Sequence, residues 1–227
     1  MDLVARLLSK IYLRRLSPYC YSTRYYSNSF NALINLQKNL GKKKCIIKGF
    51  IPINSFQYKN IDILINILER DILDKKFISI IKNALFNGYY KYYNNNWYDI
   101  SKGRFTYNII NKPIPSSLFN KIILNIYLRE FDTFIHKLQN DNNKFFYVRY
   151  NDEFIIGLND DNISTNLTLC INEFISNRLC LNHELSIYNI FYQYVEFLGY
   201  MFIRKDNIIK LSIPTKKITR DLESNFF

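Results

Sequence analysis

Two adjacent carboxylates, Asp152 and Glu153, stand between two mostly apolar runs of the chain. These runs, 145–150 and 154–157, have the length and residue types of β-strands. A tight turn between two such strands holds both carboxylates out of the core, where they can bind a divalent cation. A solvated hairpin tip has the same pattern, so the pair alone indicates either a metal site or an ordinary turn.

A second group of residues could bind a polyanion. The formal net charge is +12, and no Asp or Glu occurs from Leu3 through Ile61, although that stretch is rich in lysine and arginine. The abundance of Ile, Asn, Lys, Tyr and Phe indicates AT-rich codons, which raise the lysine content but do not by themselves remove carboxylates. The candidate nucleic-acid contacts are Arg14, Arg15, Arg24, Lys42, Lys43, Lys44 and Lys48. Any one of them taken alone is better explained as a solvated surface charge.

The other chemistry-bearing residues form no recognisable site. The four cysteines include no CxxC pair, and one nearby histidine, His183, does not make a zinc pattern. His136 and His183 are isolated, so we expect both to be structural. Glycine is too scarce for a phosphate-binding loop, and no run of eighteen apolar residues indicates a membrane span. We therefore expect no cofactor, no bound metal and no membrane partner.

The elements that must position these residues follow from periodicity and turn signals. We expect helices over 30–40, 61–73, 76–86, 116–138 and 165–178. We expect strands over 44–51, 104–109, 145–150 and 154–157, a loop at 112–115, and a hairpin formed by 194–204 and 208–211. Helices packed on a small antiparallel sheet make an α+β fold.

The chain divides into three parts by composition. Residues 1–40 form a basic helical segment, 41–213 form the main domain, and 214–227 form a short tail. The first thirty residues have apolar side chains at helical spacing between basic ones, followed by a stretch rich in Ser, Tyr and Arg. This pattern is typical of an organellar transit peptide, and equally of a basic helix packed on the domain.

Several sequence blocks resemble the group II intron reverse transcriptase and maturase family. The stretch FYVRYNDEFIIG, 146–157, is similar to the family's YVRYADDFIIG block in the palm, with Asn151 in place of Ala and Glu153 in place of the second Asp. Residues 122–132 resemble its LLANIYLHELD helix, 195–200 its FLGY strand, and 47–50 its DIKGFFD strand. Residues 17–36 weakly resemble the SYGFRPGRSAHDAL segment of the fingers, so the resemblance extends from about 17 to 211. It implies reverse-transcriptase-like fingers and palm.

The departures from the family pattern concern catalysis. Polymerase chemistry holds two Mg²⁺ ions between carboxylates on adjacent strands, and the resemblance places one of these carboxylates at Ile46. The GTPQGG loop aligns with 112–117, where its glycines and glutamine are missing. We also expect the family's thumb to be missing, because the chain ends soon after Leu211. Asp152 and Glu153 would then be a vestige without metal.

The resemblance implies an RNA-binding, maturase-like protein that assists splicing of a group II or related intron without reverse transcriptase activity. Its partner would be intron RNA, in an organelle with an AT-rich genome, either a plastid or a mitochondrion. Three alternatives remain open: a structural subunit of an organellar ribonucleoprotein, a functionless intron-encoded remnant, and an enzyme with an unusual metal site at Asp152 and Glu153.

Overall fold

The computed structural model describes residues 2–22, 28–52, 58–86, 90–93, 96–99, 117–140, 145–205 and 208–214. The helices are α1 (Asp2–Tyr12), α2 (Ser29–Leu40), α3 (Tyr58–Asp71), α4 (Lys75–Phe86), α5 (Ser117–Asn140), α6 (Asp161–Glu173) and the π-helical turn η4 (Phe174–Arg178). The strands are β1 (Cys45–Phe50), β2 (Tyr90–Tyr93), β3 (Asn96–Asp99), β4 (Phe146–Tyr150), β5 (Glu153–Leu158), β6 (Glu184–Asn189), β7 (Val195–Phe197), β8 (Tyr200–Lys205) and β9 (Ile208–Ser212).

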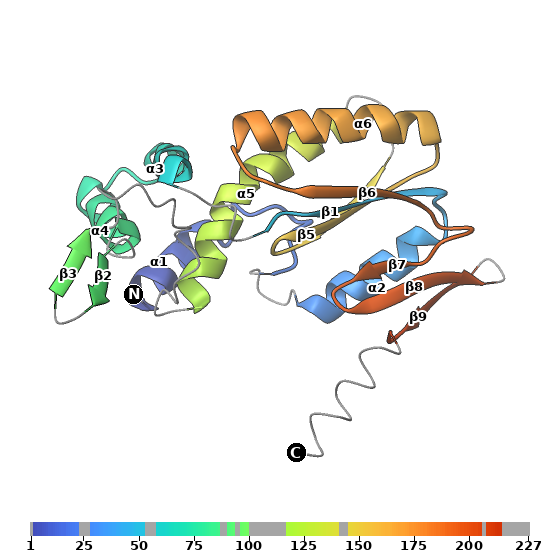
Figure 1. Ribbon diagram of the computed structural model, residues 1–227, viewed down its shortest axis with the longest axis horizontal. Coiled ribbons are helices and arrows are strands. Elements are labelled where there is room, and N and C mark those ends of the chain that lie inside the picture. The colour runs from blue at the N-terminus through green and yellow to red at the C-terminus, as the bar shows by residue number, and fades with distance from the viewer. Residues whose placement is uncertain are drawn as a thin grey trace, which may run out of the picture.

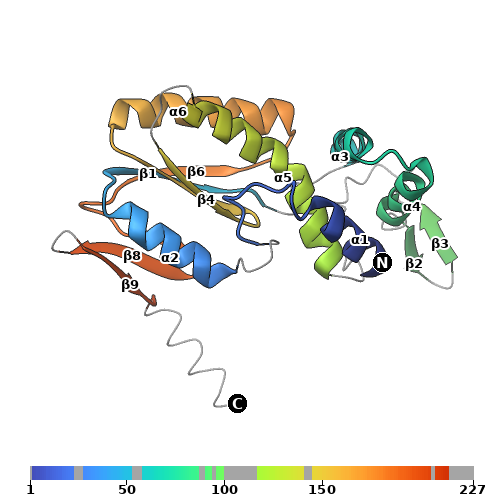
Figure 2. The same ribbon diagram turned by 180° about the vertical axis from the view of Figure 1, so that it is seen from behind.

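The centre of the molecule is a four-stranded antiparallel sheet in the order β4-β5-β1-β6. Helices α5 and α6 cover one of its faces (Figure 1), and α2 with the three-stranded sheet β7-β8-β9 covers the other (Figure 2). Because both faces are covered, β4 and β5 are apolar at consecutive positions and not only at alternate ones. The expected α+β architecture, with helices on small antiparallel sheets, is confirmed.

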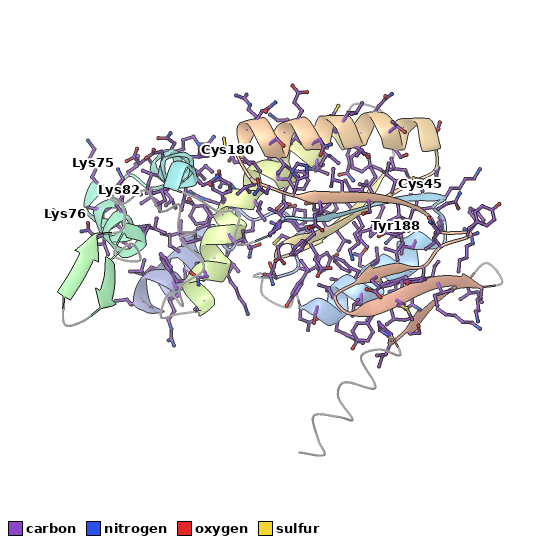
Figure 3. All side chains as sticks on the ribbon, viewed as in Figure 1. Cys45, Lys75, Lys76, Lys82, Cys180 and Tyr188 are labelled. Atoms are coloured by element: carbon purple, nitrogen blue, oxygen red, sulfur yellow. The ribbon has the colours of Figure 1, made fainter. Side chains whose placement is uncertain are left out.

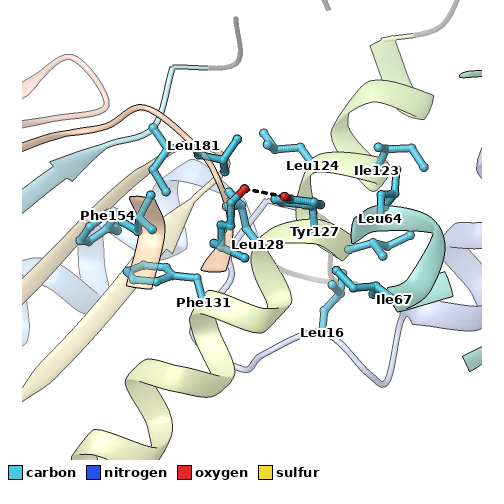
Figure 4. Packing of buried hydrophobic residues seen from close by; sticks show 14 of the residues in the cluster. Leu16, Leu64, Ile67, Ile123, Leu124, Tyr127, Leu128, Phe131, Phe154 and Leu181 are labelled. Carbon is cyan, nitrogen blue, oxygen red and sulfur yellow. Dashed lines mark hydrogen bonds between the residues drawn. The ribbon is translucent and has the colours of Figure 1, made fainter. Parts of the chain in front are cut away.

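The longest helix, α5, links this sheet to the helical end of the molecule, where α1, α3 and α4 lie (Figure 1). The side chains of Tyr127, Phe131 and Ile135 on α5 are fully buried in the larger of two hydrophobic clusters. Figure 4 shows this packing, with Tyr127 between the leucines and isoleucines of α3 and α5. The Tyr127 hydroxyl donates a 2.6 Å hydrogen bond to the carbonyl of Leu179, which ties α5 to the end of η4.

Helix α1 packs directly on α5 through Ala5, Leu8 and Tyr12, which are fully buried. The Tyr12 ring also lies 5.3 Å beneath the guanidinium carbon of Arg129 on α5. Of the two interpretations of this basic N-terminal segment, the packing favours the helix that belongs to the fold. Among the described residues, no helix has the length and apolarity that would let it cross a lipid bilayer.

One expectation for the C-terminal part was wrong, and one strand there was not expected. Residues 194–204 are not one strand, because Leu198 and Gly199 have φ angles of 52° and 78° and form a tight turn between β7 and β8. Gly199 meets the positive φ without a steric penalty, and the block FLGY is therefore a hairpin turn. The sequence patterns also missed β6, which pairs with β1 along its whole length. The expected strand 104–109 and loop 112–115 lie outside the described residues.

Packing against β5 explains why a glycine occupies position 49 of β1. A Cβ atom at this position would stand 2.0 Å from the ring of Phe154 on β5, its direct partner in the sheet. The Phe154 ring is fully buried, with its centroid 4.9 Å from that of Phe131 on α5. Gly49 therefore lets α5 close over the sheet, and any larger residue would displace this aromatic contact.

Candidate nucleic-acid interface

The two carboxylates lie at the turn between β4 and β5. Tyr150 and Glu153 are the last paired residues, so the turn itself consists of Asn151 and Asp152. Asn151 has a φ of 52°, a left-handed conformation that Asn adopts more readily than most residues. The amide of Ile51 donates a 2.9 Å hydrogen bond to the carbonyl of Asp152, which joins the turn to the end of β1.

A buried guanidinium holds this turn in place. Arg149 binds both carboxylate oxygens of Asp132, from Nε to Oδ1 at 2.8 Å and from Nη2 to Oδ2 at 2.6 Å. Its Nη1 donates to Oδ1 of Asn125 at 2.8 Å and to the carbonyl of Asn151 at 2.7 Å. The Tyr147 hydroxyl donates to the same Asp132 carboxylate at 2.6 Å. The polar residues of two blocks, 122–132 on α5 and 146–157 on β4 and β5, thus meet in one network.

Burial sets the charge states in this network. Burial disfavours the charged guanidinium, but Asp132, with smaller contributions from Cys20 and Tyr147, raises the pKa of Arg149 well above its ordinary value. Burial and the same carboxylate raise the pKa of Tyr147 well above 10.0. Burial, aided by the neighbouring charge of Glu153, also raises the pKa of the Asp152 carboxyl. The turn is therefore positioned by a permanent ion pair, while Asp152 itself sits in surroundings that oppose its charge.

The strand register corrects the alignment that placed a missing carboxylate at Ile46. In the sheet Ile46 lies opposite Gly157, while Phe50 lies opposite Glu153. Four residues along a strand amount to about 13 Å, too far for a side chain at position 46 to share an ion with the turn. Ile46 is instead fully buried against α2 and Val148. The residue of β1 that faces the turn is Phe50, and it too has no metal-binding group.

Glu153 is engaged within the protein. Its Oε2 accepts a 3.4 Å hydrogen bond from the amide of Leu198, in the turn between β7 and β8. Among the described residues, no three or more His, Cys, Asp or Glu side chains lie close enough together to hold a metal ion. The geometry gives Glu153 the role of joining the small sheet to the large one.

The basic candidates separate into two groups at opposite ends of the molecule. Arg14 and Arg15 follow α1 at the helical end, where Arg15 forms a 3.3 Å ion pair with Asp71. The segment Lys42–Lys44 lies between α2 and β1, beside Cys45, which Figure 3 labels at the other end of the molecule. Lys48 lies further along β1, on the face of the sheet that carries Glu153. Arg24 lies outside the described residues.

The structure adds residues to the Lys42–Lys44 segment that the sequence analysis missed. Arg204 on β8 donates a 3.4 Å hydrogen bond from Nη1 to the carbonyl of Lys43, and Lys205 beside it is exposed. Burial lowers the pKa of Lys43, whereas Lys42 and Lys44 are exposed. The separation of some 160 residues along the chain hides this association from any local pattern.

Comparison with known proteins gives a curated relative and similar solved structures. No family model matches the chain. Over 80 residues it is 34% identical to an uncharacterized 91 kDa protein in a cob intron of Schizosaccharomyces pombe (strain 972 / ATCC 24843), an overlap that covers 35% of this chain and 9% of that protein. In three dimensions 93% of the chain matches 38% of a chain of the Candida albicans telomerase, with a TM-score of 0.61 and 14% sequence identity. The fold is similar to that of telomerase.

Both likenesses concern parts of longer proteins. The chain spans about a tenth of its intron-encoded relative and well under half of the telomerase chain. That telomerase was solved in complex with the TWJ fragment of telomeric RNA. At 14% identity the likeness establishes the shared fold, and the relative establishes a link to an intron-encoded protein.

Proposed function

We propose that the protein is an RNA-binding, maturase-like factor that assists splicing of a group II or related intron and has no reverse transcriptase activity. The observation that carries the proposal is the sheet of β4, β5, β1 and β6. Its carboxylate-bearing turn is anchored by Arg149, but the adjoining strand faces that turn with Phe50. We assign this sheet to the palm of a reverse-transcriptase-like fold, and the helices α3 and α4 to the fingers.

The proposed absence of polymerase chemistry follows from the side chains that are available to bind metal ions. Two metal ions about 4 Å apart need carboxylates from both strands, and β1 supplies none at any of its positions from Cys45 to Phe50. Glu153 accepts a hydrogen bond from the amide of Leu198 through one of its oxygens, and burial raises the pKa of Asp152. These features support the proposal that the sheet keeps its fold but does not bind the metal ions that nucleotide transfer requires.

Three observations support an RNA partner. The net charge is +12, and Lys42–Lys44 with Arg204 and Lys205 gather basic groups at one end of the sheet. The relative is a protein of a cob intron, and the telomerase of similar fold was solved with RNA. Phosphate contacts of lysine and arginine supply affinity and position for structured RNA. The cob intron of the relative is consistent with the AT-rich organelle that the composition indicates.

The test is binding of the purified chain to a structured group II intron RNA and to an unrelated RNA of equal length, across a salt series. We expect tighter binding to the intron and an affinity that falls steeply with salt. The variant Lys42→Gln/Lys44→Gln should reduce the slope of log affinity against log salt by roughly 0.7–0.9 for each phosphate that the removed amines neutralise. Equal affinity for both RNAs would contradict intron specificity and favour a structural role in a ribonucleoprotein. Absence of binding to either would favour a functionless remnant.

A further inference from the structure

Exposed aromatic rings lie beside the basic segment Lys42–Lys44. The loop between β6 and β7 presents Phe191, Tyr192 and Tyr194 with 45%, 87% and 54% of their surfaces exposed. This loop follows Tyr188, which Figure 3 labels at the same end of the molecule as Cys45. Tyr192 is among the most exposed large side chains of the described residues, although burying an aromatic ring would normally stabilise the fold.

The aromatic loop is fixed to the basic segment by hydrogen bonds. The amide of Ile190 donates to the carbonyl of Lys44 at 3.0 Å. Asn189 closes the turn, because its carbonyl accepts from the amides of Tyr192 and Gln193 and its side chain accepts from the amide of Phe191. The rings are therefore held by an ordered backbone, so this loop loses little conformational entropy when a ligand covers it.

A cation is already stacked on one of these rings. The guanidinium carbon of Arg204 lies 4.1 Å from the centroid of Phe191, within cation–π distance. The same side chain reaches the carbonyl of Lys43. Phe191 and Tyr192 have their centroids 6.5 Å apart at an interplanar angle of 48°, so their outer faces point in different directions. One carboxylate, Asp160, follows closely after Leu158, whose carbonyl accepts from the amide of Lys44.

Exposed rings interleaved with lysine and arginine have a specific chemical preference. Each unpaired base offers a π-face that stacks on an aromatic side chain, while the backbone phosphates contact the cations. In a duplex the faces of the bases are already stacked on one another, and only their edges remain accessible. A charged surface without aromatic rings would bind duplex and single-stranded RNA alike through their phosphates, without a preference for unpaired bases.

We propose that the aromatic platform, consisting of Lys42–Lys44, Phe191, Tyr192 and Arg204, binds unpaired nucleotides of single-stranded RNA by base stacking. The proposal rests on the RNA binding proposed above and specifies its form. The bases of a loop, bulge or strand end stack on Tyr192 and on the Phe191–Arg204 pair. The phosphates between them contact the exposed amines of Lys42 and Lys44.

The experiment measures fluorescence anisotropy of an oligouridine of about twelve nucleotides and of a blunt RNA duplex of the same length, with the full chain. The test variant is Tyr192→Ala. Because Tyr192 is exposed, we expect this variant to fold, and its thermal unfolding is measured in parallel. Phe30→Ala is the matched control, because Phe30 is 64% exposed but lies at the start of α2, about 15–18 Å along the helix from Lys42.

We expect Tyr192→Ala to weaken oligouridine binding by roughly 5- to 100-fold and to leave duplex binding unchanged. Phe30→Ala should change neither, and Lys42→Gln/Lys44→Gln should weaken both. Oligouridine affinity that is equal in Tyr192→Ala and the wild type, or an equal reduction for both RNAs, would overturn the stacking platform while RNA binding itself stands. Failure of the wild type to bind either RNA would instead overturn the proposed function.

Discussion

Arg149 shows how a residue of a catalytic-looking block can act through structure. Its four hydrogen bonds end on Asp132, Asn125 and the carbonyl of Asn151, all within the protein. The guanidinium and the Asp132 carboxylate are both buried. Such a pair contributes little over a well-packed apolar replacement, but removal of one partner leaves a buried charge.

The first prediction concerns this pair. Asp132→Ala should lower the free energy of unfolding by about 3–5 kcal/mol, because Arg149 would remain charged and unpaired in the core. Glu130→Ala on the same helix is the control, since its 2.7 Å pair with Arg70 lies at the surface and should contribute about 0–1 kcal/mol. Urea denaturation of both variants measures the difference. Similar destabilisation of the two variants would show that the buried pair does not anchor the turn.

The second prediction concerns the protonation of Asp152. Burial raises its pKa above 3.8, so the folded chain holds this proton more tightly than the unfolded chain does. The resulting stability is fully present below 3.8 and is lost as the pH rises through the folded pKa. Asp152→Asn, which imitates the neutral form, should therefore raise stability at about pH 7 and change it little at about pH 3. Thermal unfolding at both pH values is the measurement, and a lower stability at neutral pH would indicate a bound cation.

At the scale of the elements, the register of β1 decides which residue faces the turn. The letters KGF align Ile46 with a carboxylate, but pairing with β5 and β6 depends on residues more than a hundred positions away. Phe154 covers Gly49 and Phe50 pairs with Glu153, and these contacts fix the register. A local sequence match contains no information about such partners.

The third prediction tests the register by adding a carboxylate. Phe50→Asp would put a carboxylate opposite Glu153 and beside Asp152, so we expect Mn²⁺ to raise the melting temperature of this variant. Ile46→Asp would bury an unpaired charge, lower stability by several kcal/mol and show no response to Mn²⁺. Thermal shift assays with and without Mn²⁺ compare the two variants. Stabilisation of Ile46→Asp alone would contradict the register.

The elements that the sequence predicted well are those with strong periodicity. Helices α2, α3, α4 and α5 begin and end within a few residues of their expected bounds, because each carries a continuous apolar stripe. Strands β4 and β5 were expected for a similar reason, since their apolar runs flank two polar turn residues. β6 was missed because its exposed edge position leaves it without a clear apolar pattern. The β7–β8 turn was missed because Leu198 gives no turn signal.

The candidate site was predictable only in part. The turn carboxylates and the lysines of 42–44 stand out by residue type, and the structure places both on the ends of one sheet. Their partners Arg204, Phe191 and Leu198 come from segments far away in the sequence, and only the folded chain brings them together. The Arg149–Asp132 pair was not predictable either, because both residues are charged and sequence patterns place charged residues at the surface.

At the scale of the whole molecule, the four-stranded sheet is packed on both faces although β1 carries no carboxylate. Two hydrophobic clusters, one on each face, hold the same four strands in place. The basic and aromatic groups gather at the end of the sheet formed by the start of β1, away from the turn carboxylates at the other end. The fold is similar to that of telomerase, and this distribution of charge supports the RNA binding proposed above.

The central claim, RNA binding without DNA synthesis, is tested most directly by one experiment with a labelled primer annealed to an RNA template. The purified chain is incubated with the primer–template, all four deoxynucleotides and Mg²⁺ or Mn²⁺. Half of each sample is run on a native gel and half on a denaturing gel. We expect a shifted complex on the native gel and a primer of unchanged length on the denaturing gel. Extension of the primer would contradict the loss of the metal site, and absence of a shift at any protein concentration would contradict RNA binding.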